Sequence, residues 1–287
     1  MFIIYNFFLS LVIFISPLII LIRIFLGKED QNRFKEKYGF LAKNNNNNEI
    51  VWIHGASVGE ILSIIPIIKK FEEDKKIKRI LITSSTTSSS LILSKFKFKK
   101  IVHQFFPIDS NFLSKKFLNY WKPSSVFFID SEIWPNMYLN LKERQISITL
   151  LNGRITKKSF LRWKKTLGFS KKIFSLFDQC FSSNKETIKF LKQLGAKKIR
   201  FIGNLKFAQS ENEKVILSKN IKKFIFSKKT WCASSTHDTE EIFCETIFLK
   251  KCTSSSNGIF YYYDNDHLTR DGARLVVDEI LTKWDQE

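Results

Sequence analysis

The sequence has few of the residues that build covalent or metal-based structure. Among its 287 residues there are four cysteines and four histidines. The cysteines form no CxxC pair and have no metal-ligand spacing, so we expect neither a disulfide framework nor a metal site. Four scattered thiols in so long a chain are typical of a reducing compartment. The cysteines are Cys180, Cys232, Cys244 and Cys252.

Acidic residues are also scarce. The chain has 47 Lys+Arg against 27 Asp+Glu, a formal net charge of +20. Such a balance favours an acidic partner, which is nucleic acid, an anionic membrane face or a phosphorylated substrate. Lysine far outnumbers arginine and the basic residues are scattered, so we expect no nucleic-acid partner.

Charge is missing altogether from the first 22 residues. At about 1.5 Å per residue this stretch is long enough for a hydrocarbon core of about 30 Å. It has neither the basic start nor the cleavage site of a secretory signal. Basic residues follow it instead, beginning at Arg23. The positive-inside rule then predicts a single membrane anchor with the body in the cytoplasm. A buried amphipathic helix is the alternative, which a stretch apolar on every face disfavours.

Past this segment, short β-rich apolar runs alternate with helix-like stretches, which predicts βαβ units and a doubly wound parallel sheet of the α/β class. Two helices are expected over residues 60–76 and 185–196, the second capped by Asn184 and ended by Gly195. The asparagine run at 44–48 is predicted to be a surface linker. The expected strands are 50–54, 79–84, 101–107, 126–130, 147–152, 178–183, 199–204 and 230–235.

Polar residues follow five of these strands, at the edge where parallel sheets bind ligands. In "HGASVGE", a helix starting near Glu60 would present free N–H groups to an anion and favour the ionised carboxylate, which suits a general base. Glu60 as an ordinary first-turn residue fits the pattern equally well. The hydroxyl-rich run at 84–90 is either a ligand loop or a polar turn that opens a helix.

The other junctions carry more charge. Asp130 and Glu132 follow one strand, and two carboxylates two residues apart in extended chain point the same way. Arg154 and Lys206 follow two later strands, where a cation neutralises phosphate or carboxylate. The fifth junction is "SSTHDTEE" at 234–241, after the last predicted strand. Each junction alone is also an ordinary capped helix start, but five on successive turns favour a site.

The ordered segments "WIHGASVGE", "FFPID", "SEIWPN", "NGRIT", "GNLKF" and "ASSTHDTEE" resemble the Kdo transferases, which attach 3-deoxy-D-manno-octulosonic acid (Kdo) to lipid A precursor. The resemblance runs from residue 1 to about residue 250. It implies a GT-B glycosyltransferase that takes Kdo from CMP-Kdo without a metal ion or other cofactor and inverts the anomeric carbon, with the membrane as a further partner.

The resemblance also implies roles for residues of this chain. The catalytic residues would be Glu60, as the base, with Asp130, Glu132 and Lys206. Acceptor-binding residues would be Ser57, Gly59, Asn152 and Arg154. Donor-binding residues would be Ser235, Thr236, His237 and Glu240.

The sequence departs from the family in two places. Asp130 stands where the family pattern has Glu, one methylene longer. After residue 252 the basic "PRH" and glycine-rich nucleotide motifs of the donor domain do not follow. The tail instead resembles the Asp/His block of SGNH-type acyltransferases, with Asp264 and His267, but no "GDS" serine motif accompanies them. A His–Asp pair without its serine does not run acyl transfer, so a polar turn is the preferred interpretation.

Together, the motifs and the departures predict a GT-B-like chain with a truncated second domain. We expect a membrane anchor at 1–24, a basic linker at 25–49, an acceptor-side domain at 50–225, the start of a donor domain at 226–252 and an atypical tail at 253–287. The leading hypothesis is Kdo transfer. The alternative is a non-catalytic, membrane-anchored module that binds a lipid A-like acceptor.

Overall fold

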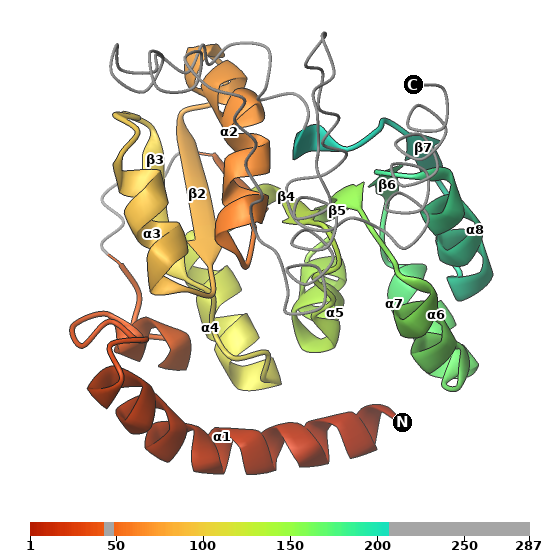
Figure 1. Cartoon of the computed structure of the whole chain (residues 1–287), viewed down its shortest axis with the longest axis horizontal. Helices are drawn as coiled ribbons and strands as arrows, with labels where there is room; N and C mark the ends of the chain where they lie inside the picture. The colour runs from red at the N-terminus through yellow and green to blue at the C-terminus, as the bar shows by residue number, and fades with distance from the viewer. Residues whose placement is uncertain (43–48, 207–287) are drawn as a thin grey trace, which may run out of the picture. The chain divides into compact units, whose positions relative to one another are not determined.

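Seven parallel strands form the centre of the structure (Figure 1), a computed structural model that describes residues 1–42 and 49–206. These residues belong to the first of two units, 1–214 and 215–287, into which the chain divides. The strands predicted up to residue 204 are present, and the one predicted at 230–235 lies outside the described residues. The strands are β1 Ile50–His54, β2 Arg79–Ser84, β3 Ile101–Phe105, β4 Pro123–Ile129, β5 Ser147–Gly153, β6 Gln179–Ser182 and β7 Ile199–Phe201.

Helices connect the strands, and their starts are set by short polar side chains. Ser57, Thr86, Ser110, Thr156 and Asn184 each accept a backbone N–H of the first turn that they precede. The helix predicted at 185–196 is confirmed, with Asn184 at its start and Gly195 at its end in the left-handed region, φ 107°. The helices are α1 Phe2–Phe25, α2 Val58–Glu73, α3 Thr87–Ser94, α4 Asn111–Trp121, α5 Pro135–Glu143, α6 Lys157–Lys164, α7 Leu167–Phe174 and α8 Lys185–Leu194, with a 3-10 turn η1 at Phe34–Tyr38.

Both faces of the sheet are buried, as the predicted doubly wound α/β fold requires. Successive strand residues point to opposite faces. Thus Ile53 packs with the apolar side of α2, whereas its neighbour Trp52 packs with Phe117 of α4 on the other face. Because helices cover both faces, the central strands β1 and β2 are largely apolar and buried instead of alternating between apolar and polar residues.

The strand order is β3-β2-β1-β4-β5-β6-β7. From β1 the chain runs outward through β2 to β3, and then returns to place β4 on the opposite side of β1. The order therefore reverses between β1 and β4. In open α/β sheets, ligands bind at the carboxyl ends of the strands on either side of such a reversal. The loops that follow β1 and β4 carry Glu60 and the Asp130–Glu132 segment.

The segment between α1 and β1 packs on the sheet as far as it is described. Arg33 donates to the carbonyl oxygen of His103 at 3.0 Å and to both carboxylate oxygens of Glu36. Glu36 in turn accepts the backbone N–H of Phe105 at 2.7 Å. Residues 25–42, which are predicted to belong to a linker, thus pack against the edge strand β3.

Helix α1 has 24 residues and is long and apolar enough to cross a membrane by length and composition. Pro17 interrupts its hydrogen-bond ladder. The hydroxyl of Ser16 donates to the carbonyl oxygen of Ile13 at 2.8 Å, the group that a residue other than proline at position 17 would bond. The same hydroxyl lies 2.8 Å from the Tyr38 hydroxyl.

One buried carboxylate joins three elements. Asp109 is 1% exposed and follows β3. Its two oxygens accept the backbone N–H of Met137 at 2.7 Å and of Asn136 at 3.0 Å, at the start of α5. They also accept the hydroxyl of Tyr5 in α1 at 2.7 Å. Asp109 therefore holds the start of α5, where the "SEIWPN" segment enters the helix, against α1.

We expect Asp109→Ala to lower the free energy of unfolding by about 2 to 4 kcal/mol, because two buried backbone N–H groups lose their acceptor. Urea unfolding followed by circular dichroism measures this. Asp74→Ala is the control, since the Asp74 side chain is exposed and accepts the nearby N–H of Lys76. That control should change stability by less than about 0.5 kcal/mol. Equal losses in the two variants would contradict the role given to Asp109.

Candidate active site at the carboxyl edge of the sheet

Glu60 is held at the first turn of α2 by a reciprocal cap. Its carboxylate accepts the Ala56 N–H at 2.8 Å and the Ser57 hydroxyl at 2.9 Å. The Ser57 oxygen accepts the Glu60 N–H at 3.3 Å in return. Gly55 leaves room for this arrangement, because a Cβ there would lie 3.3 Å from Cβ of Glu60. The side chain is therefore fixed beside the carboxyl end of β1.

The pKa of Glu60 is raised to about 7, first by burial and then by the nearby Glu132 carboxylate. The cap and the Ala56 N–H lower the pKa but do not prevail. The groups at the helix start thus favour the ionised form, as expected, but burial and the Glu132 charge outweigh them. A carboxylate with a pKa near neutrality is a stronger proton acceptor than an ordinary glutamate, and both of its forms exist near pH 7.

Asp130 follows β4 in an unexpected conformation. Its φ is 62°, the left-handed region, so the extended geometry assumed for the Asp130–Glu132 pair is wrong. Burial raises the pKa of Asp130, while the charges of Arg154 and Lys206 lower it. One carboxylate oxygen, Oδ1, is buried and has no hydrogen-bond partner among the described residues. Asp130 is nevertheless close to Glu60, because its charge raises the pKa of Glu60.

Glu132 lies between Glu60 and a buried histidine. Its Oε2 is 3.6 Å from Nε2 of His54. His54 is fully buried at the end of β1, with Nδ1 2.9 Å from the Thr83 hydroxyl and its ring centroid 4.1 Å from that of Phe106, in a tilted arrangement. From the sequence, His54 is predicted only as the last residue of the strand 50–54. A polar side chain that ends an otherwise apolar strand was the available signal.

The predicted acceptor-side and cationic residues gather at the same edge. Asn152, the last but one residue of β5, has φ 56° and accepts the Leu205 N–H at 3.0 Å, which fixes the segment before Lys206. The Lys206 Nζ would lie 3.8 Å from a Cβ added at Gly59, so the ammonium sits at the first turn of α2. Arg154 is exposed and close enough to act on Asp130.

The structure thus brings together eight of the twelve predicted site residues: Ser57, Gly59, Glu60, Asp130, Glu132, Asn152, Arg154 and Lys206. The four predicted donor-binding residues, Ser235, Thr236, His237 and Glu240, lie outside the described residues. The hydroxyl run at 84–90 behaves as a polar turn: Thr86 caps α3, and Ser84 and Ser90 contact His103. Within residues 1–42 and 49–206, no group of three His, Cys, Asp or Glu side chains is arranged to hold a metal ion.

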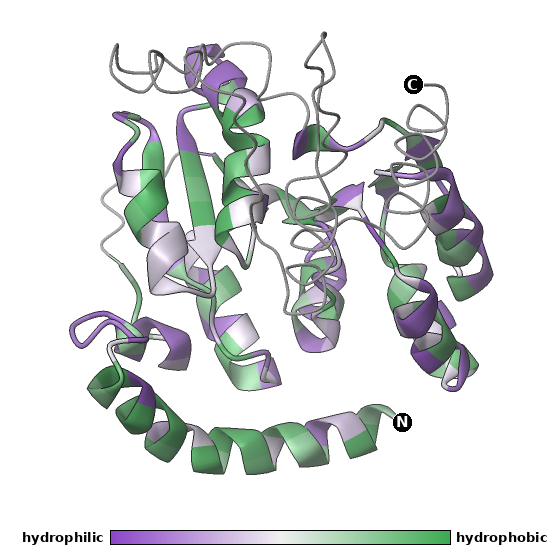
Figure 2. Cartoon of the chain, in the orientation of Figure 1, coloured by the Kyte–Doolittle hydropathy of each residue, from purple (hydrophilic) through white to green (hydrophobic). Residues whose placement is uncertain are grey.

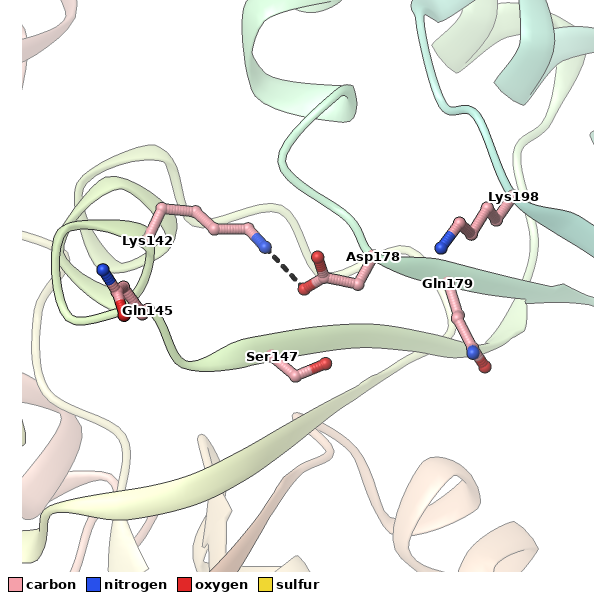
Figure 3. Close-up of a pocket in the computed structure, with 6 residues that line it drawn as sticks. All are labelled: Lys142, Gln145, Ser147, Asp178, Gln179 and Lys198. Atoms are coloured by element: carbon pink, nitrogen blue, oxygen red, sulfur yellow. Dashed lines mark hydrogen bonds and ion pairs between the residues drawn. The ribbon is translucent and has the colours of Figure 1, made fainter.

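A hollow of about 550 Å³ lies at the opposite end of the sheet (Figure 3). It is formed where β5 and β6 begin, and an ion pair between Lys142 and Asp178 lies in it. Asp178 also accepts the Ile148 N–H at 2.8 Å, so its charge is used within the fold. This hollow and the cluster of Glu60, Asp130 and Glu132 are therefore separate features.

Comparison with known proteins agrees with this geometry. The model of the 3-deoxy-D-manno-octulosonic-acid transferase family (kdotransferase) matches residues 32–209, and that of the SGNH domain (fused to AT3 domains) matches residues 206–282. A 3-deoxy-D-manno-octulosonic acid transferase of Rickettsia bellii is 35% identical over 83% of this chain and 57% of its own length. A probable mitochondrial 3-deoxy-D-manno-octulosonic acid transferase of Arabidopsis thaliana is 30% identical over 83% of this chain and 56% of its own.

Among solved structures, a UDP-GlcNAc 2-epimerase from Neisseria meningitidis bound to UDP-GlcNAc superposes with a TM-score of 0.43 at 14% identity, over 55% of this chain and 47% of that one. The chain spans little more than half the length of the two transferases above. The family match covers most of the chain, including every predicted site residue that the structure describes. This protein belongs to the 3-deoxy-D-manno-octulosonic-acid transferase family.

Proposed function

We propose that this protein transfers Kdo from CMP-Kdo to a lipid A precursor, in the lipopolysaccharide core, with Glu60 as the general base. Glu60 takes the proton of the acceptor hydroxyl as that oxygen bonds to the anomeric carbon of Kdo and the bond to the CMP phosphate breaks. The pair of electrons of that bond leaves with CMP. The anomeric configuration inverts because the attack and the departure occur on opposite faces of the sugar.

The observation that supports this most is the state of Glu60. Its carboxylate is fixed by two hydrogen bonds, carries a pKa of about 7 and stands at the reversal point of the sheet. A base works best when its pKa lies near the operating pH. A glutamate that only capped α2 would have no need of Glu132 and Asp130 as neighbours, because these carboxylates oppose its charge.

The neighbouring groups have complementary roles in this proposal. Lys206 at the start of α2 and the exposed Arg154 stabilise negative charge on phosphate or on the Kdo carboxylate. Ser57 and Gly59 shape the acceptor's approach to Glu60, and Asn152 holds the Lys206 segment in place. Ser235, Thr236, His237 and Glu240 are proposed donor contacts, by the family resemblance alone.

The net charge of +20 suits both the phosphates of the acceptor and the anionic cytoplasmic leaflet. We place the protein on the cytoplasmic side of the inner membrane, where an amphiphilic acceptor and a soluble nucleotide-sugar meet. Helix α1 provides the attachment.

We expect Glu60→Gln to reduce Kdo transfer by about 100-fold or more, the usual contribution of a general base. The assay incubates the full chain in membranes with CMP-Kdo and lipid A precursor, and measures the glycosylated lipid. Glu72→Gln is the matched control: Glu72 lies at the far end of α2 and accepts the Lys99 and Lys100 N–H groups. Retained transfer in Glu60→Gln would remove the base assignment. Precursor binding by the unmodified chain without any transfer would instead support a non-catalytic acceptor-binding module.

The pH dependence offers a second test. Only ionised Glu60 accepts a proton, so kcat/KM should fall about tenfold per unit below a midpoint near pH 7. Glu132→Gln removes a repulsive charge and should move this midpoint to lower pH, whatever it does to the maximal rate. Glu72→Gln should leave the midpoint unchanged. A midpoint that stays fixed in Glu132→Gln means that Glu60 does not limit the acidic side of the profile.

A further inference from the structure

His54 is a buried polar side chain at the edge where the strands stop being apolar. Figure 2 shows β2 hydrophobic along its middle and pale at its tip, the end that carries Thr83. His54 lies opposite Thr83 in the register of β1 and β2, and both residues are 0% exposed. A buried imidazole is costly unless both of its nitrogens have partners. The surroundings of the two nitrogens therefore indicate its role.

Nδ1 of His54 faces Thr83. It lies 2.9 Å from the Thr83 hydroxyl and 3.2 Å from the Thr83 carbonyl oxygen. The same hydroxyl also accepts the indole N–H of Trp52 at 2.9 Å. Of these two neighbours of the hydroxyl, the indole only donates, so Nδ1 accepts the hydroxyl proton of Thr83. The ring proton of His54 then lies on Nε2.

Nε2 lies beside the Glu132 carboxylate. Within the described residues this buried nitrogen has no hydrogen-bond partner, and Oε2 of Glu132 is 3.6 Å away. That separation is longer than a hydrogen bond, and a movement of about 0.7 Å would close it. A buried N–H attracts a carboxylate strongly, because the protein interior screens charge poorly. The opposite tautomer would direct a lone pair at the carboxylate and repel it.

Aromatic rings hold the imidazole in this orientation. Its centroid lies 4.1 Å from that of Phe106 and 5.7 Å from that of Phe128, both of which are buried. Trp134 adds a third ring, with its centroid at 6.0 Å. Because these rings pack around it, the imidazole cannot turn away from Glu132 without opening the core.

The position of Glu132 matters to Glu60. The carbonyl oxygen of Glu132 accepts the hydroxyl of the buried Tyr138, which fixes its backbone. Its carboxylate is the largest cause, after burial, of the raised pKa of Glu60. The Glu132 side chain is 20% exposed. Without a buried partner, the carboxylate can therefore turn toward water, where its charge acts on Glu60 more weakly.

We propose that His54 is a positioning residue, which keeps the Glu132 carboxylate close to Glu60 through its Nε2–H. The catalytic value of this arrangement rests on the proposed function of Glu60 as the base. His54 acts through Glu132, since its ring is fully buried. The other charged or titratable groups around the two carboxylates are Asp130 after β4, Tyr138 of α5, Lys206 at the first turn of α2, and Arg154, which acts on Asp130.

The site of the ring proton is measured in the unmodified chain. Labelling with [15N]histidine gives ring-nitrogen signals for four histidines, and His54→Gln assigns those of His54. A two-bond proton–nitrogen correlation spectrum distinguishes the tautomers. We expect the proton on Nε2, and a proton on Nδ1 overturns the proposal.

Two substitutions separate the roles of the ring nitrogens. Asparagine places its amide near the position of Nδ1 and glutamine near that of Nε2, so only His54→Gln retains a donor to Glu132. The readout is the protonation midpoint of Glu60. It is taken from the infrared carboxyl band after subtraction of the same protein carrying Glu60→Gln. We expect the midpoint to fall by about one pH unit in His54→Asn and to stay near pH 7 in His54→Gln.

His103→Asn is the matched control. His103 is also a buried strand histidine, and its ring nitrogens contact Arg33 and Ser84. Its loss should leave the Glu60 midpoint unchanged. An equal shift in His103→Asn and His54→Asn would mean that any buried histidine at this edge has the effect, and it would overturn the proposal.

Non-additivity shows whether His54 acts through Glu132. Once Glu132→Gln has removed the carboxylate charge, His54→Asn should add no further shift. A full shift in that background overturns the proposal, as does an unchanged midpoint in His54→Asn with a native circular dichroism spectrum. These titrations need no glycosyl transfer. An infrared midpoint that shifts while the kcat/KM midpoint does not would support the positioning and contradict Glu60 as the base.

Discussion

The candidate site depends on holding like charges together. Glu60, Glu132 and Asp130 repel one another at the carboxyl ends of β1 and β4, and this repulsion adds to burial in raising the pKa of Glu60. Two hydrogen bonds to Ala56 and Ser57 keep the Glu60 carboxylate in place, while Lys206 and Arg154 offset charge at Asp130. The sheet order makes this crowding unavoidable, because the reversal between β1 and β4 sets their two loops side by side. The fold therefore stores an unfavourable interaction where chemistry can use it.

A second carboxylate, Asp109, links this edge to the first helix of the chain. Its oxygens satisfy the start of α5 and the Tyr5 hydroxyl together. Burial raises its pKa to about 7, although these three donors lower it. The attachment of α1 and the position of the "SEIWPN" loop are thus parts of one hydrogen-bonded unit. In the proposed picture the acceptor lipid and the catalytic edge meet because that unit holds both.

The secondary structure could be predicted well because its signals are local. Apolar runs such as 50–54 and 79–84 are the strands β1 and β2 without change of boundary, and Asn184 and Gly195 mark α8 at both ends. The gathering of Glu60, Asp130 and Glu132 also followed from the parallel topology. The backbone conformation of Asp130 and the pKa of Glu60 could not be predicted in this way, because both depend on tertiary surroundings. The left-handed Asp130 and the raised pKa of Glu60 arise from burial and from neighbours that are distant in sequence. The same holds for α1, whose uniform hydrophobicity concealed the partners of Tyr5 and Asn6.

Pro17 shows how a helix with an interrupted series of backbone hydrogen bonds is made compatible with a hydrocarbon environment. Proline leaves one carbonyl, that of Ile13, without its usual donor, and such a group is costly wherever water is absent. The Ser16 hydroxyl meets that need from the adjacent position, and Tyr38 completes its bonding. The defect is thereby solvated by the protein itself. At this position the helix therefore needs no hydrogen-bond donor from its surroundings. Hydrocarbon can cover its outer side without displacing a backbone partner.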